Sequence, residues 1–231
     1  MKNYLIVGAS SGIGKQLSRQ LAEAGHSVYG TYFSHPVQNA TDGIHYSPFN
    51  VLEDEPDLGF LPDELDGLVY CPGTINLKPF KRIKPESFTE DFNLQVTGAV
   101  KVIQACLPRF INEGASIVLF STVAVQQGFN FHSQVSASKG AIEGLTRALG
   151  AELAPKIRVN CIAPSLTDTP LAARLLGTDE KREANAQRHP LKKIGTATDL
   201  ANAAEFLLSE KSGWMTGQVI HVDGGMSTLK V

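Results

Sequence analysis

Short apolar runs alternate along the chain with longer segments in which apolar residues recur at helical spacing. The runs that predict buried strands are Leu5–Val7, Ser27–Tyr32, Ile44–Phe49, Gly67–Cys71, Ser116–Phe120, Ile157–Ile162 and Val219–Val222. The segments with helical spacing are Ile13–Ala24, Phe88–Phe110, Val135–Leu153 and Leu200–Leu208. This alternation predicts an α/β fold, a Rossmann-type doubly wound parallel sheet of about seven strands with helices on both faces.

Two of the connections between predicted strands leave little room for a helix. Pro36 and Gly43 interrupt the second connection, and Pro56, Gly59 and Pro62 interrupt the third. We therefore expect short or missing helices there. No repeat, low-complexity tract or linker divides the chain, so residues 1–231 are expected to form a single domain.

Composition and charge exclude several classes of function. The 231 residues carry 21 Lys and Arg against 23 Asp and Glu, a net charge of −2, so no basic excess is available for nucleic acid. No apolar run is long enough to span a bilayer, and the one at the N-terminus is too short for a signal peptide. Three widely spaced cysteines suggest reduced thiols and a cytoplasmic protein without a metal site.

Gly8, Gly12 and Gly14 lie at the junction between the first predicted strand and the first predicted helix. Glycine at such a junction permits a tight turn, a close approach of the backbone to a pyrophosphate and close packing of the helix on the sheet. The helix that follows directs its free N–H groups and partial positive charge at the same point. The turn therefore predicts a dinucleotide site, with contacts from Gly8, Ser10, Ser11, Gly12, Ile13 and Gly14.

Several segments, in the same order along nearly the whole chain, resemble the short-chain dehydrogenase/reductase family. The turn Gly8-x-x-x-Gly12-Ile13-Gly14 resembles the cofactor turn of that family. Other similar segments are Cys71-Pro72-Gly73 at a strand end, Asn93, the pair Ser121-Thr122, Ser136–Lys139, Pro164–Thr169 with Ser165 in place of a glycine, and Thr216–Gly225. The resemblance implies an NAD(P)-dependent oxidoreductase that acts on a carbonyl or alcohol as a homodimer or homotetramer.

The end of the second predicted strand bears on which dinucleotide is bound. An acidic residue there would select NAD, and a nearby arginine would favour NADP. Tyr32 stands where the resemblance puts the acid and Phe33 where it puts the basic residue, so no carboxylate repels a 2′-phosphate. NADP is therefore preferred and NAD is the alternative, with hydrogen bonds to the phosphate expected from Thr31, Ser34 and His35. The further cofactor contacts implied by the resemblance are Asn50, Val51, Cys71, Gly73, Lys139, Pro164, Thr167 and Thr169.

The catalytic set that the resemblance implies is incomplete. In the family, a tyrosine gives its proton to the substrate oxygen, and a lysine four residues later binds the nicotinamide ribose. Lys139 is present, but the tyrosine position is Val135, which has no proton to transfer. The other residues assigned by the resemblance are Asn93, Ser121 and Thr122. His132 shares a helix face with Lys139 if the helix begins early enough, which makes it a candidate proton donor.

Two functions follow from this sequence. One is an oxidoreductase whose proton comes from water, His132 or the substrate; the other is a dinucleotide-binding pseudoenzyme, a sensor or partner subunit without turnover. The segment around residues 166–198 is expected to form a substrate lid, with Leu171, Leu175 and Leu176 at helical spacing. The basic side chains of this segment, which are better explained as a solvated face than as a site for an anion, are Arg174, Arg188, His189, Lys192 and Lys193.

Overall fold

A computed structural model describes residues 1–37, 42–53 and 57–230, and its centre is a parallel sheet of seven strands. The strands are β1 (Asn3–Val7), β2 (Ser27–Tyr32), β3 (Ile44–Pro48), β4 (Gly67–Tyr70), β5 (Ala115–Phe120), β6 (Ile157–Pro164) and β9 (Val219–Val222). Their order is β3-β2-β1-β4-β5-β6-β9. The chain adds β2 and β3 on one side of β1 and then adds β4 and the later strands on the other side, so the strand order reverses between β1 and β4. Sheets of this kind bind ligands beyond the carboxyl ends of the strands at such a reversal. The predicted Rossmann-type α/β fold is confirmed.

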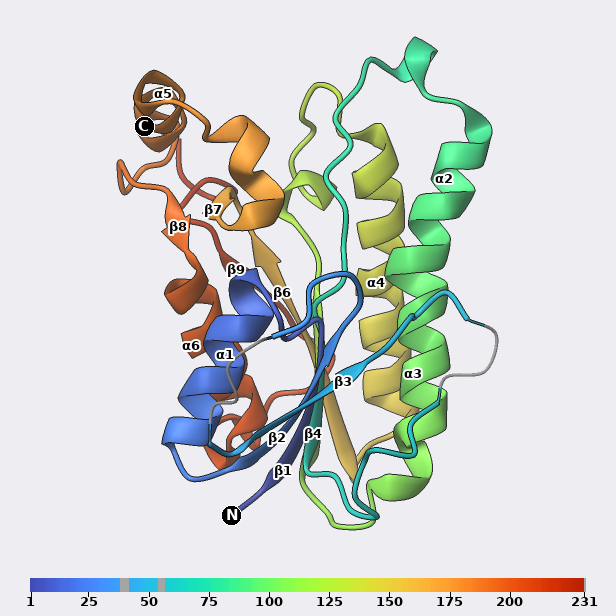
Figure 1. The fold of residues 1–231 in the computed structure, drawn as a ribbon. Coiled ribbons are helices and arrows are strands. Elements are labelled where there is room, and N and C mark those ends of the chain that lie inside the picture. The colour runs from blue at the N-terminus through green and yellow to red at the C-terminus, as the bar shows by residue number, and fades with distance from the viewer. Residues whose placement is uncertain (38–41, 54–56, 231) are drawn as a thin grey trace.

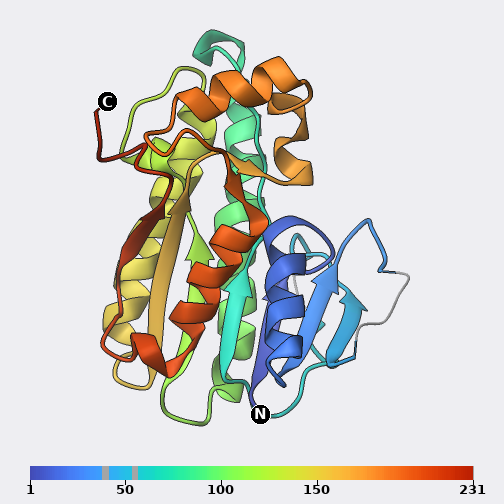
Figure 2. The same ribbon diagram turned by 90° about the vertical axis from the view of Figure 1, so that its left-hand side faces the viewer.

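Helices cover both faces of the sheet (Figures 1 and 2). One face carries α1 (Gly12–Glu23) and α6 (Ala197–Leu208), and the other carries α3 (Gly98–Cys106) and α4 (Ser133–Glu152). Successive strand residues point to opposite faces, so Leu5 packs in the core on the α3 and α4 side while Ile6 packs on the α1 and α6 side. Both side chains are fully buried, as expected for a central strand covered on both faces.

The chain enters α3 through a short helix and a π-helical turn. The α2 helix (Pro85–Phe92) begins with proline at its first position, where no backbone N–H is needed. A π-helical turn at Asn93–Thr97 then joins α2 to α3. The predicted helix over residues 88–110 is therefore present, but its period changes in the middle.

The second and third connections carry no helix in their described residues, 33–37, 42–43, 49–53 and 57–66. Residues 38–41 and 54–56, the latter including Pro56, lie outside the described residues. Among the helices of the described chain, none has the length and apolar character needed to cross a membrane.

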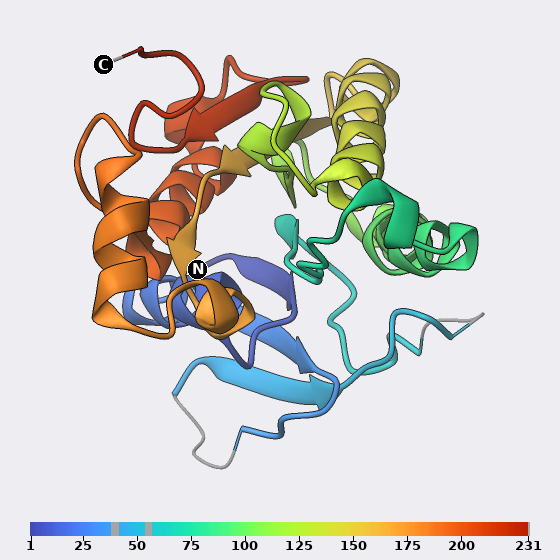
Figure 3. The same cartoon turned by 90° about the horizontal axis from the view of Figure 1, so that it is seen from above.

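Residues 165–196, which follow β6, form a separate excursion above the carboxyl ends of the strands (Figure 1). It contains β7 (Thr167–Asp168), a 3-10 helix at Pro170–Leu175, α5 (Asp179–Gln187) and β8 (Gly195–Thr196). The strands β7 and β8 pair in parallel, which brings the two ends of the excursion together at its base. Figure 3 views the molecule from this end, with the excursion on one side and α2 and α4 on the other.

Candidate functional site

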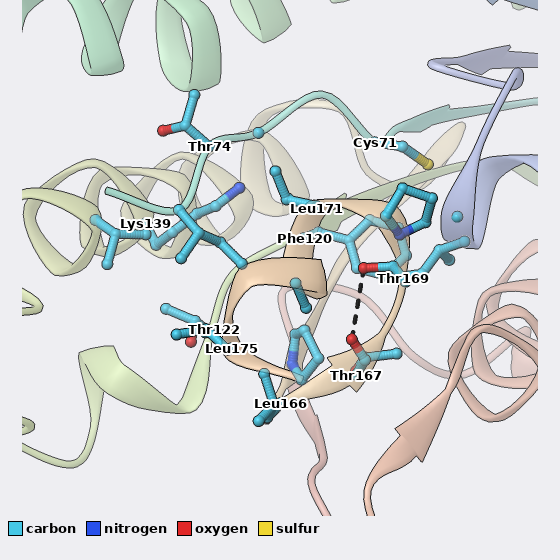
Figure 4. A pocket seen from close by; sticks show the side chains of 18 of the residues that line it. Cys71, Thr74, Phe120, Thr122, Lys139, Leu166, Thr167, Thr169, Leu171 and Leu175 are labelled. Carbon is cyan, nitrogen blue, oxygen red and sulfur yellow. Dashed lines mark hydrogen bonds between the residues drawn. The ribbon is translucent and has the colours of Figure 1, made fainter. Parts of the chain in front are cut away.

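A single cavity of about 540 Å³ joins the glycine turn to the beginning of α4. The loops that follow β1, β4, β5 and β6 line it, and the 3-10 helix at Pro170–Leu175 contributes Leu171 and Leu175 (Figure 4). The described residues that line the cavity include no aspartate or glutamate, whereas Lys139 and Arg188 both line it. The cavity therefore favours a ligand with negative charge.

The glycine turn has the conformation that a dinucleotide site requires. Gly8 and Gly12 have φ values of +83° and +53°, which residues other than glycine rarely adopt. A Cβ on Gly14 would lie 2.3 Å from the carbonyl oxygen of Gly8, so only glycine lets α1 approach β1 this closely. Ser11, the N-cap of α1, makes no side-chain capping bond, which leaves the first N–H groups of the helix available to an anion. Ser10, Ser11 and Ile13 line the cavity with the glycines, so the turn fits a pyrophosphate.

Not every residue expected near the adenosine half of the cofactor lies in the cavity. Ser34 and His35 both line the cavity, and Ser34 Oγ lies 2.8 Å from Nδ1 of His35. Thr31 is buried instead, and its Oγ1 accepts a hydrogen bond of 3.1 Å from the N–H of Gly8. This bond holds the glycine turn on β2, and Thr31 lies outside the lining of the cavity, so its contact with a phosphate stays a prediction.

Asn50 and Val51 also lie outside the lining of the cavity. The side-chain oxygen of Asn50 accepts a hydrogen bond of 3.1 Å from the N–H of Leu52, which closes a local turn. Val51 packs in the core on the α3 side. Both residues therefore lie outside the lining of the cavity, and their contacts with a cofactor stay predictions.

Lys139 reaches into the middle of the cavity from α4 (Figure 4). Burial lowers the pKa of its ammonium group from 10.5 to about 8, against the opposing effect of Cys161, Asp91 and Cys71. Val135 lies one turn earlier on the same face of α4, lines the cavity and is 8 % exposed. The position that faces the cavity beside Lys139 is therefore apolar.

The two residues after β5 face different partners. Thr122 lines the cavity, and its oxygen accepts a hydrogen bond of 3.3 Å from the N–H of Ala124, so its own hydrogen can be donated to a ligand. Ser121 also lines the cavity, but its hydroxyl donates to the buried carboxylate of Glu143 at 2.9 Å. Thr122 is thus the better placed of the two to bind a carbonyl oxygen.

The structure does not bring Asn93 to the cavity. Asn93 is exposed, whereas Gln95 is fully buried and lines the cavity. Side chains two residues apart in a helical turn do not face the same way, so both cannot point inward. The amide side chain that this turn brings to the cavity is therefore that of Gln95 and not that of Asn93.

Gln95 belongs to a buried polar cluster centred on Asp91. The carboxylate of Asp91 accepts hydrogen bonds from Gln95 Nε2 at 2.7 Å, from Ser138 Oγ at 2.6 Å and from Thr74 Oγ1. Asp91 is 3 % exposed, and the cluster joins α2, α4 and the loop after β4. Nothing in the hydrophobic pattern marks Asp91, since a single acidic residue in a helix is usually on the surface.

Comparison with known proteins places this arrangement in a family. The family model described as enoyl-(acyl carrier protein) reductase matches residues 60–227. The chain belongs to the short-chain dehydrogenase/reductase family. It is 31% identical to a 3-oxoacyl-[acyl-carrier-protein] reductase of Aquifex aeolicus, with 97% of each chain covered. It is 30% identical to the L-xylulose reductase of Bos taurus, over 97% of this chain and 96% of the bovine one.

Solved structures of the short-chain dehydrogenase/reductase family have the same fold. A family member from Mycobacterium ulcerans superposes with a TM-score of 0.88 at 28% identity, covering 98% of this chain and 90% of that one. The structure of ElxO with NADP bound superposes with a TM-score of 0.85 at 25% identity, covering 99% of this chain and all of that one. The chain therefore belongs by sequence and by fold to a family of NAD(P)-dependent oxidoreductases.

The remaining residues predicted for the site line the same cavity. They are Cys71, Gly73, His132, Pro164, Thr167 and Thr169. Thr169 Oγ1 donates to the carbonyl oxygen of Thr167 at 3.5 Å, as drawn in Figure 4. Ser165 and His189 are two further lining residues that the sequence did not assign to the site, and they are hydrogen-bonded to each other. The described residues contain no group of three or more His, Cys, Asp or Glu placed to hold a metal ion.

Proposed function

We propose that the protein reduces a carbonyl compound with NADPH, and that the segment of residues 166–198 is its substrate lid. The observation that carries this proposal is the cavity, because it connects a pyrophosphate turn at one end with Lys139 and Thr122 at the other. The bound dinucleotide would supply the hydride. Lys139 would hold its nicotinamide ribose, and Thr122 would donate a hydrogen bond to the substrate oxygen as negative charge develops there.

NADP is proposed over NAD because of the charges around the cavity. Phe33, Ser34 and His35 line its end beyond β2, and no carboxylate of the described residues lines it. A 2′-phosphate would meet hydroxyl and imidazole groups rather than a negative charge. The NADP-bound structure of ElxO supports this choice.

Val135 favours a second candidate, a dinucleotide-binding protein without dehydrogenase turnover. We propose that Val135 occupies the place of the catalytic tyrosine, since it lies one turn before Lys139 and faces the cavity. Losing a positioned general acid costs about 10²–10⁴ in rate unless another group replaces it. Turnover in the native protein therefore requires another source of the proton.

Cofactor titration followed by a turnover assay separates the two candidates. We expect NADPH fluorescence to report binding tighter than that of NADH, and NADPH to be oxidised in the presence of acetoacetyl-CoA or L-xylulose, which represent the substrates of the named relatives. NADPH binding without oxidation by either compound would favour the protein without turnover. Absence of NADPH binding would contradict both candidates.

A further inference from the structure

Ser165 and His189 form a hydrogen-bonded pair on the wall of the cavity. Ser165 follows β6, and His189 lies just beyond the end of α5 in the excursion. Ser165 Oγ and His189 Nε2 are 2.8 Å apart, and both residues line the cavity that Lys139 enters. A hydroxyl bonded to an imidazole in a binding cavity is an arrangement that can transfer protons.

The second ring nitrogen of His189 fixes which nitrogen carries the proton. Nδ1 lies 2.8 Å from the backbone carbonyl oxygen of Asn185, which can only accept, so Nδ1 donates. In the neutral ring, Nε2 therefore accepts from the hydroxyl of Ser165. In the doubly protonated ring, Nε2 donates to Ser165 Oγ, and the hydrogen of Ser165 becomes free to be donated into the cavity.

Packing holds the His189 ring in this position. The residue is 2 % exposed, although it lines the cavity. A Cβ on Gly224 would lie 3.6 Å from His189 Cβ and Cδ2, so the turn after β9 packs against this side chain. With both nitrogens bonded and one side covered, the ring has little freedom to turn away from Ser165.

His132, the histidine predicted as a donor, lacks the second half of this arrangement. Its Nδ1 lies 2.7 Å from the backbone carbonyl oxygen of Asn130, as for His189. No hydroxyl group of the described residues is hydrogen-bonded to its Nε2, and the residue is half-buried at the start of α4. Of the two histidines, only His189 is connected to a hydroxyl that lines the cavity.

We propose that Ser165 and His189 supply the proton for carbonyl reduction, in place of the tyrosine absent at Val135. This inference rests on the proposed function. When the carbonyl carbon receives hydride, the electron pair of the C=O π bond moves to the oxygen, which takes the proton of Ser165 Oγ. Ser165 takes the proton from Nε2 of the protonated His189, which becomes neutral and keeps its Nδ1 hydrogen on Asn185. Water returns one proton to His189 before the next turnover.

The first test needs neither cofactor nor substrate. The ¹⁵N NMR spectrum of the full chain is recorded at a pH at which the imidazole rings are neutral. We expect the ring of His189 to carry its hydrogen on Nδ1. His189→Gln assigns the signal, and Ser165→Ala should move the Nε2 resonance because it removes the donor. A hydrogen on Nε2, or an unchanged Nε2 resonance in Ser165→Ala, would overturn the pair.

The second test measures turnover with NADPH and acetoacetyl-CoA or L-xylulose. We expect His189→Gly to lower kcat by about 10²–10⁴ while the Kd for NADPH is unchanged, and added imidazole to restore part of the rate. Ser165→Ala should also lower kcat, but imidazole should not rescue it, because the missing group is the hydroxyl. His45→Gly is the matched control, since His45 lies exposed on β3 away from the cavity, and it should keep the native rate.

The outcomes distinguish the relay from the function on which it rests. If the native protein reduces a probe and both variants keep its rate, the relay is wrong and the proposed function stands. If only Val135→Tyr reduces a probe, the cofactor site is intact but the native residues provide no proton, which also overturns the relay. If NADPH does not bind at all, the proposed function fails and the relay fails with it.

Discussion

Gln95 Nε2 donates a hydrogen bond of 2.7 Å to Asp91 Oδ2, and this bond determines which way the amide of Gln95 faces. With the nitrogen on Asp91, Oε1 is directed toward Gly73, where a Cβ would lie 3.3 Å from Oε1 and 3.7 Å from Lys139 Nζ. Oε1 is buried and has no hydrogen-bond partner among the described residues. Asp91 therefore orients an acceptor toward the same point that the ammonium group of Lys139 approaches.

Replacing Asp91 with asparagine should destabilise the protein. The substitution keeps the shape but places an NH₂ group among three donors, so at least one buried hydrogen bond is lost. We expect the free energy of unfolding to fall by about 1–3 kcal/mol, measured by urea denaturation. Glu90→Gln makes the same change at an exposed neighbouring position and should stay within about 0.5 kcal/mol of the native protein. Equal stabilities for the two variants would contradict this account of the cluster.

Introducing tyrosine at Val135 should create or raise carbonyl reduction. A phenol one turn before Lys139 on the cavity face of α4 adds a proton donor, and the adjacent ammonium group lowers the pKa of that phenol. We expect kcat to rise by up to about 10²–10⁴ if the native residues supply no proton, and by less if Ser165 and His189 already supply it. The rate is measured as NADPH oxidation with acetoacetyl-CoA or L-xylulose. Val135→Phe adds a ring of similar size without a hydroxyl and should give no gain. A variant with tyrosine that binds NADPH but gains no rate would show that position 135 does not face the reacting carbonyl.

The buried Lys139 should give the protein a measurable pH dependence of stability. Burial lowers its pKa to about 8 in the folded state, whereas the unfolded value is near 10.5. Between these values the unfolded chain holds a proton that the folded chain has released, so the contribution of Lys139 to stability rises with pH. At pH 7 the ammonium group is charged in both states, and the folded state bears the full cost of burying that charge.

Comparison with Lys139→Met isolates this contribution up to pH 10.5. Burial raises the pKa of the Cys71 and Cys161 thiols to about 12 although Lys139 lowers it, so both thiols stay protonated in the folded state of either protein over this range. From pH 8 to pH 10.5, we expect the native free energy of unfolding to increase relative to that of the variant by up to about 3 kcal/mol, at about 1.4 kcal/mol per pKa unit. Denaturant unfolding at a series of pH values measures the difference. A difference independent of pH in this range would mean that Lys139 keeps an ordinary pKa in the folded protein.

An acidic residue at Tyr32 should reverse the proposed preference for NADPH. Tyr32 ends β2, and Phe33, Ser34 and His35 after it line the cavity. Tyr32→Asp should weaken NADPH binding at least about tenfold, or about 1.4 kcal/mol, through repulsion of the 2′-phosphate, while NADH binding is kept or improved. The asparagine of Tyr32→Asn has nearly the shape of aspartate without its charge, so this variant should still bind NADPH more tightly than NADH. Fluorescence titration with both cofactors measures the effect, and equal losses in the two variants would rule out charge as its cause.

The periodicity of the sequence was sufficient to predict the sheet. Buried parallel strands such as β5 are continuous apolar runs, and the glycine turn identifies the place where the first strand meets its helix. The cavity beyond that turn follows from the topology, since the carboxyl ends of parallel strands meet at one edge. These features depend on residues close together in the chain, which is why a single sequence reveals them.

The sequence is less informative where distant segments meet or where the helical period changes. The family resemblance points to Asn93, but the side chain that lines the cavity is that of Gln95, because the π-helical turn at Asn93–Thr97 leaves no mark in the sequence. Thr31, for which the sequence predicts a phosphate contact, lies outside the lining of the cavity and accepts a hydrogen bond from the N–H of Gly8. The pairing of Ser165 with His189 spans 24 residues and depends on how the excursion folds back, which no local pattern reports.

The bridge between β7 and β8 makes the excursion an exchangeable part of the molecule. Thr167 pairs with Gly195 and Asp168 with Thr196, so the chain leaves and re-enters the body of the protein at adjacent points. The ion pair between Asp168 and Arg182, 2.7 Å long, closes the excursion on itself. Doubling the length of such a loop adds only about 0.6 kcal/mol to the entropy of closing it. We therefore expect residues 170–184 to accept a segment of different length and composition, with Thr169, Asn185 and His189 kept, and grafting there offers a route to new substrate ranges on an unchanged sheet.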